Sequence, residues 1–167
     1  MNSGTRARLT ALLAVPALVA GCGGDEPTTA TEAPPPSGPA CPDQLPEEGP
    51  GDPAGTSPDL QLPDRASICR YELSDAAWRL DGEPVQVAGG SLAPVADGLG
   101  ALAPADPGRM CTQELGPRWL VVWDDGSGRR GAVVEGYGCR DVRLTEDSGV
   151  LTGPPRLLDS IRAAYDG

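Results

Sequence analysis

Apolar residues recur with a regular period only from about residue 66 onward, so this region has the pattern of a packed domain. Residues 68–73 combine β-branched, aromatic and aliphatic side chains, which predicts a first strand. Two further short strands, 78–80 and 84–87, flank the dipeptide Asp81-Gly82. An Asp-Gly pair between two apolar segments predicts a two-residue hairpin turn.

The run 119–123 is apolar at every position, as expected of a central strand that is covered on both faces. The polar, glycine-containing segment 124–128 then reverses the chain. Residues 132–134 begin a return strand, which we expect to continue toward Val142 and Leu144. This long hairpin predicts antiparallel pairing.

Two segments have helical spacing. Residues 91–102 place apolar side chains three or four positions apart, and we expect Ser91 to cap this helix, with Pro94 in its first turn. Pro154 and Pro155 open a second helix, whose apolar residues lie within 157–165. Strands, helix, long hairpin and helix in this order predict an α+β fold with a small, mainly antiparallel sheet and two helices.

The preceding region has a different composition. The whole chain has 23 glycines and 19 prolines among 167 residues, which is close to the content of low-complexity sequences. Residues 22–65 are rich in proline, glycine and acidic side chains and have no apolar period. Such a segment cannot bury enough surface to offset its ordering entropy. We therefore expect a disordered Pro/Gly-rich tether over 22–65 and a folded domain over 66–167.

The first residues have the pattern of an export signal. Arg6 and Arg8 precede an apolar run, 9–20, that is shorter than the twenty or so residues needed to span a bilayer. The run ends in Leu18-Val19-Ala20-Gly21-Cys22, which resembles the lipobox of bacterial lipoproteins.

The lipobox resemblance implies that 1–21 is a signal peptide, that the chain is cut before Cys22, and that the Cys22 sulfur carries a diacylglycerol. The protein would then be anchored to the extracytoplasmic face of the cell membrane through this lipid. The alternative is an ordinary secretory signal in which Cys22 occurs by chance. Arginine is the basic residue throughout, and this usage resembles that of actinobacterial proteins.

Four cysteines remain once Cys22 is assigned to lipid, and an even number in an exported domain predicts disulfides. Cys111 and Cys139 are equally distant from residue 125, in the centre of the predicted turn. We therefore expect them to face each other on neighbouring strands, within disulfide range. Cys41 then pairs with Cys69, which ties the end of the tether to the first strand.

The composition also restricts the chemistry. There is no histidine, and all thirteen basic residues are arginine, so the usual bases near neutral pH are missing and we expect no catalytic residue. A carboxylate-dependent hydrolase is the alternative, with Asp124-Asp125 or Glu47-Glu48 as candidate pairs, although turn and tail positions favour solvated carboxylates. We expect no metal and no cofactor, because the ligand spacings of zinc and calcium sites are absent from the sequence. The net charge of −11 disfavours nucleic-acid binding.

Residues 110–117, Met-Cys-Thr-Gln-Glu-Leu-Gly-Pro, precede the apolar run 119–123, an Asp-Gly turn, Gly128-Arg129-Arg130 and Cys139. This order resembles the subtilisin-inhibitor-like family of secreted actinobacterial proteins.

The resemblance to this family implies that 110–117 is a protease-binding loop. Its contact residues would be Met110, Thr112, Gln113 and Glu114, with Gln113 immediately before the scissile bond. The sequence departs from the family in three respects. The family's second disulfide joins a strand to a helix, whereas helix 91–102 here has no cysteine. Gln113-Glu114 is an unusual scissile pair, and a lipid anchor is unexpected in a diffusible inhibitor.

These features together predict a lipid-anchored extracytoplasmic protein with a non-catalytic binding role toward a protein or cell-wall partner. The alternative is a serine protease inhibitor of the subtilisin-inhibitor-like type, with its reactive loop at 110–117. The sequence leaves the ligand and the oligomeric state open.

Overall fold

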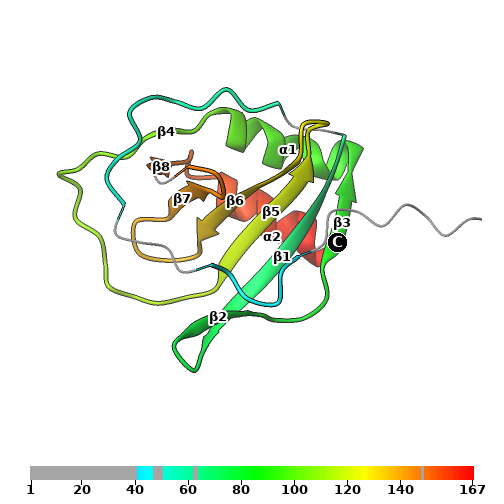
Figure 1. The fold of residues 1–167 in the computed structure, drawn as a ribbon, viewed down its shortest axis with the longest axis horizontal. Helices are drawn as coiled ribbons and strands as arrows, with labels where there is room; N and C mark the ends of the chain where they lie inside the picture. The colour runs from blue at the N-terminus through cyan, green and yellow to red at the C-terminus, as the bar shows by residue number, and fades with distance from the viewer. Residues whose placement is uncertain (1–40, 47–50, 62–63, 148) are drawn as a thin grey trace, which may run out of the picture. The chain divides into compact units, whose positions relative to one another are not determined.

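The computed structural model describes residues 41–46, 51–61, 64–147 and 149–167. They all belong to one compact unit, in which two helices pack against an antiparallel sheet of eight strands (Figure 1). The predicted α+β class is confirmed. The strands are β1 (Arg65–Ser74), β2 (Ala77–Leu80), β3 (Val85–Ala88), β4 (Ala103–Pro104), β5 (Arg118–Asp124), β6 (Arg129–Glu135), β7 (Asp141–Leu144) and β8 (Val150–Thr152), and the helices are α1 (Gly89–Gly100) and α2 (Leu157–Asp166).

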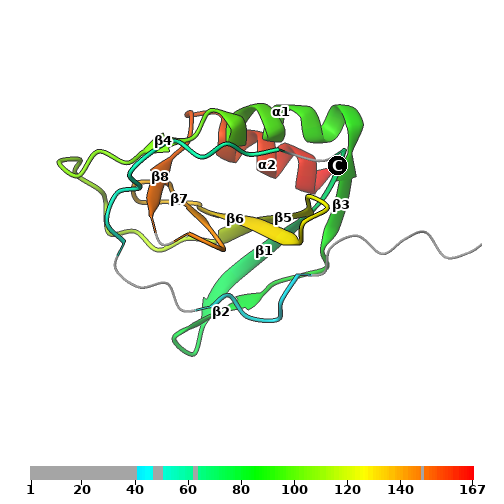
Figure 2. The ribbon, with the colours of Figure 1, turned by 45° about the horizontal axis from the view of Figure 1, so that its top comes forward.

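The strand order is β2-β1-β5-β6-β7-β8-β4, with β3 also paired to β1. Both helices lie on the same side of the sheet, as Figure 2 shows. Alternation along β5 directs Trp119, Val121 and Trp123 toward this helical side, where they join the main core. Val95 of α1 and Ile161 of α2 are fully buried in the same core.

The opposite face of the sheet has a smaller core. Leu120 and Val122 of β5 are buried there beside Cys69 and Tyr71 of β1, so β5 is covered on both faces, as its sequence predicts. Burial raises the pKa of the Tyr71 phenol above its usual range, and the nearby Asp43 carboxylate adds to this effect.

Residues 41–46, expected to be tether, help to cover this second face. Leu45 is 3% exposed, its N–H donates to the Trp78 carbonyl oxygen at 3.0 Å, and the Tyr71 hydroxyl donates to the Pro42 carbonyl oxygen at 2.8 Å. Hydrogen bonds to main-chain atoms hold this segment, and they require no regular spacing of apolar residues, so the sequence pattern did not predict that 41–46 is folded.

Residues 51–61 also belong to the folded unit. The Val150 N–H donates to the Asp52 carbonyl oxygen at 2.8 Å, and the Ala54 N–H donates to the Val150 carbonyl oxygen at 2.9 Å. The domain boundary expected at residue 66 therefore leaves out segments 41–46 and 51–61, which belong to the folded unit. Residues 22–40 lie outside the described part of the chain.

The hairpin predicted at Asp81-Gly82 is wrong. β2 and β3 both pair with β1, and four residues, 81–84, lie opposite only two residues of β1. The Asp-Gly pair therefore lies in an irregular, bulge-like connection between β2 and β3 along one edge of β1, with Gly82 at φ 80°. The hairpin turn lies instead at Asp75 and Ala76, whose φ angles of 51° and 63° match the twist that tight hairpins require.

Two other boundaries differ from expectation. β6 ends at Glu135 and turns through 136–140 into β7, so the return strand does not continue to Val142. α1 begins at Gly89, two residues before Ser91, and its N-cap residue is Ala88, which makes no side-chain cap.

Candidate functional site

The segment from Met110 to Leu115 is the most exposed apolar-containing part of the described chain. It forms neither helix nor strand, and all six residues are exposed. Met110 is 99% exposed and Leu115 is 74% exposed. Two large apolar side chains, Met110 and Leu115, are thus exposed at the ends of one six-residue segment, which makes this segment a candidate binding surface.

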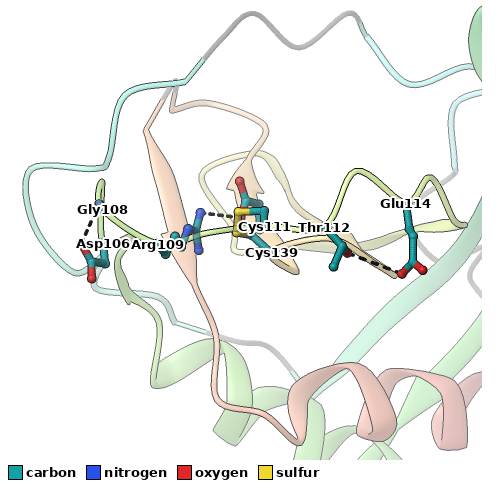
Figure 3. The surroundings of a disulfide bond; sticks show 8 residues. Asp106, Gly108, Arg109, Cys111, Thr112, Glu114 and Cys139 are labelled. Atoms are coloured by element: carbon teal, nitrogen blue, oxygen red, sulfur yellow. Dashed lines mark hydrogen bonds and ion pairs between the residues drawn. A yellow bond between two sulfur atoms is a disulfide. The ribbon is translucent and has the colours of Figure 1, made fainter.

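The N-terminal side of this segment is fixed by covalent and ionic contacts. Cys111 forms a disulfide with Cys139 of the turn between β6 and β7, with 4.8 Å between the Cα atoms. Just before it, Arg109, which Figure 3 labels beside the disulfide, makes an ion pair with Asp141 at the start of β7. The Asp106 carboxylate also accepts a hydrogen bond from the Gly108 N–H at 2.8 Å and closes the preceding turn.

The C-terminal side packs against the same 136–140 turn. Gly116 lies against the Tyr137 ring, where an added Cβ would come within 1.7 Å of Cδ2. The Gly136 N–H donates to the Pro117 carbonyl oxygen at 2.9 Å. The turn therefore supports the exposed segment at both of its ends.

Both disulfide pairings predicted from the sequence are confirmed, Cys41–Cys69 and Cys111–Cys139. The geometric reason given for the second pair is wrong, because neither cysteine lies in a strand. β5 and β6 pair with Arg118 opposite Glu135, and the chain leaves this ladder before it reaches either cysteine. The bridge joins a loop to a turn.

A cavity of about 290 Å³ lies between the exposed segment and the turn. Gln113 and Glu114 contribute to it from the segment, and Tyr137 and Asp141 from the turn and β7. The end of the sheet contributes three side chains that interact with one another. Arg118 bonds to Glu135 at 3.1 Å, and its guanidinium lies 4.5 Å from the centre of the Trp78 ring.

The four predicted contact residues, Met110, Thr112, Gln113 and Glu114, lie together on the exposed segment. The Thr112 hydroxyl lies 3.5 Å from Glu114 Oε2, and both residues are exposed. Four residues that support the site were not predicted from the sequence: Arg109, Trp78, Arg118 and Tyr137. The glycines at 136 and 138 around Cys139 were the available signal for a tight supporting turn.

Asp124 and Asp125, a candidate carboxylate pair, hold the β5–β6 turn. The Asp124 carboxylate accepts the Gly126 N–H at 3.0 Å, and that of Asp125 accepts the Ser127 hydroxyl at 2.6 Å and its N–H at 2.9 Å. These two Ser127 donors, with a smaller contribution from Arg130, lower the pKa of Asp125 to about 2. The alternative pair, Glu47-Glu48, lies outside the described residues.

The structure does not describe the residues on which the membrane anchor was predicted. Cys22 and the signal segment 1–21 also lie outside the described residues. Within the described ranges, no helix has the length and apolar character needed to cross a membrane. The same ranges contain no cluster of three or more His, Cys, Asp or Glu residues suited to a metal ion.

Comparison with models of known protein families, with curated proteins and with solved structures gives no match for this chain.

Proposed function

We propose that this chain is a lipid-anchored extracytoplasmic protein that binds a partner protein, without catalysis, through the exposed segment 110–115. The location rests on the signal pattern and on Cys22 in its lipobox-like setting, and the two disulfides fit an oxidising compartment. The binding role rests on one observation: an exposed segment with apolar side chains at both ends is supported on both sides by a single turn.

Support of this kind favours binding for an energetic reason. A flexible loop loses conformational freedom when it is bound, and this loss reduces affinity. The disulfide at Cys111 and the contact of Gly116 with Tyr137 restrict the segment before any partner arrives. Met110 and Leu115 then offer apolar surface that a partner can bury.

Site-specific cross-linking tests this proposal. A photoreactive amino acid at position 113 of the full chain, expressed in the producing cells, is expected to give one discrete cross-linked protein. The matched control carries the same photoreactive amino acid in place of Asp97, which is exposed on α1. Identical products from both positions, or none from position 113, contradict the proposed segment. Mass spectrometry of the N-terminal peptide separately tests whether Cys22 carries lipid.

The second candidate function is serine protease inhibition by segment 110–117. The favouring observation is that Gln113 lies two residues after a disulfide-bonded cysteine in an exposed, supported segment. A slowly cleaved inhibitor loop requires such rigidity. Subtilisin-type enzymes should then be inhibited stoichiometrically, and the Gln113→Pro variant should not inhibit. Absence of inhibition at micromolar protein removes this candidate and leaves the first intact.

A further inference from the structure

The cavity behind the exposed segment carries an excess of negative charge. Three carboxylates line it, those of Glu114, Glu135 and Asp141, against the single guanidinium of Arg118. Arg109, which pairs with Asp141 from outside the lining, reduces the excess to one negative charge.

The positive charges at this site already have partners. Arg118 bonds to Glu135 and also lies over the Trp78 ring, and Arg109 bonds to Asp141. Among the described residues, the Glu114 carboxylate has a single hydrogen-bond contact, 3.5 Å from the Thr112 hydroxyl. An incoming cation thus finds an exposed carboxylate in the lining of the cavity, whereas an incoming anion would have to compete for guanidiniums that are already in ion pairs.

Aromatic rings and size add to this preference. Trp78 and Tyr137 both line the cavity; Arg118 already lies over the Trp78 ring, so the Tyr137 ring is the one that can attract a cation within about 6 Å of its centre. The volume of about 290 Å³ lies at the lower limit for small-molecule pockets, and therefore suits one long side chain rather than a folded element. The chain's net charge of −11 favours the approach of a positively charged surface.

We propose that this cavity receives an arginine side chain of the partner protein that docks on segment 110–115; the identity of the partner contact rests on the proposed function. A planar guanidinium can stack on an aromatic ring while it donates two hydrogen bonds to a carboxylate, which a lysine ammonium cannot do. Glu114 accepts those hydrogen bonds, and Tyr137, 46% exposed, offers the ring.

The test uses the full exported chain, purified in detergent with its disulfides formed and labelled with ¹⁵N. The probe is Nα-acetyl-arginine amide, and the neutral control probe is Nα-acetyl-citrulline amide, which has nearly the same shape. The chain has three tryptophans. We expect a saturable shift of the Trp78 indole signal with the arginine probe alone, while the signals of the core residues Trp119 and Trp123 stay unchanged.

Two variants locate the binding. Glu114→Gln should weaken binding of the arginine probe roughly threefold, as expected for the loss of a partly solvated charge pair. Glu83→Gln, at an exposed glutamate outside the cavity, is the matched control and should bind like the parent.

Equal shifts with the citrulline probe, no saturable shift at Trp78, or an undiminished affinity in Glu114→Gln would each overturn the proposal. The result is independent of the cross-linking at position 113. A partner that cross-links at position 113 without any binding of the arginine probe leaves the proposed function intact. Binding of the arginine probe without a cross-linked partner supports the arginine site and contradicts docking on segment 110–115.

Discussion

Removal of the two disulfides in separate variants provides a matched test of what each bridge does. Each bridge joins cysteines 28 positions apart. The chain-entropy model therefore assigns the same stabilisation to both, about 3.5 kcal/mol. A difference between the variants Cys111→Ala/Cys139→Ala and Cys41→Ala/Cys69→Ala must then come from the surroundings of the sulfur atoms.

Those surroundings differ strongly. Cys69 is fully buried in the smaller core, whereas Cys111 is exposed. Loss of the buried sulfur leaves a void that costs about 1 kcal/mol more. We therefore expect a loss of about 3.5 kcal/mol for the Cys111/Cys139 variant and about 4.5 kcal/mol for the Cys41/Cys69 variant.

Urea denaturation of both variants and of the oxidised parent at pH 7 measures these losses. Amide hydrogen exchange should also accelerate in segment 110–115 of the Cys111/Cys139 variant and not in the other. A Cys111/Cys139 variant that loses more stability than its counterpart would refute the burial argument. A loss below about 1 kcal/mol in either variant would refute the entropic one.

Three further predictions concern single residues. Leu45→Ala should lower the free energy of unfolding in urea by about 2–3 kcal/mol, because Leu45 is buried. Leu115→Ala, at an exposed leucine, is the control and should change it by less than about 0.5 kcal/mol. Equally small losses in the two variants would contradict the packing of 41–46 on the domain. Ala76→Gly should raise stability by about 1 kcal/mol, since Ala76 has a φ of 63°, and a destabilised variant would contradict the assigned turn. Asp125→Asn should destabilise the protein at pH 7. Because folding lowers the pKa of Asp125 to about 2, this contribution is fully present above pH 4 and disappears as the pH falls to about 2; a loss independent of pH in thermal unfolding would exclude it.

The sequence predicted those elements whose apolar side chains face a core. The continuous run 119–123 and the spacing of Leu157, Leu158 and Ile161 identify β5 and α2 because packing selects their side chains directly. Segment 41–46 is attached by main-chain hydrogen bonds, one buried leucine and a disulfide, and segment 51–61 by main-chain hydrogen bonds. Neither kind of attachment leaves an apolar period, so both segments were assigned to the tether.

The same distinction applies to the turns and to the site. Asp81-Gly82 has the sequence of a hairpin turn, but pairing with β1 over both β2 and β3 overrides this local preference. The exposed residues 110–115 could be found from their sequence order. The cavity behind them could not, because it depends on Trp78 and Tyr137, which are far apart in the chain.

The bridge between Cys41 and Cys69 has a mechanical consequence. A force that pulls on the main chain at Cys41 passes through the sulfur atoms to the middle of β1, and the intervening residues carry no load. Roughly 95 Å of extended chain therefore stays unavailable until the bridge is reduced. Single molecules of the Cys111→Ala/Cys139→Ala variant, which lacks the other bridge, would show this hidden length as the difference in total extension with and without reductant.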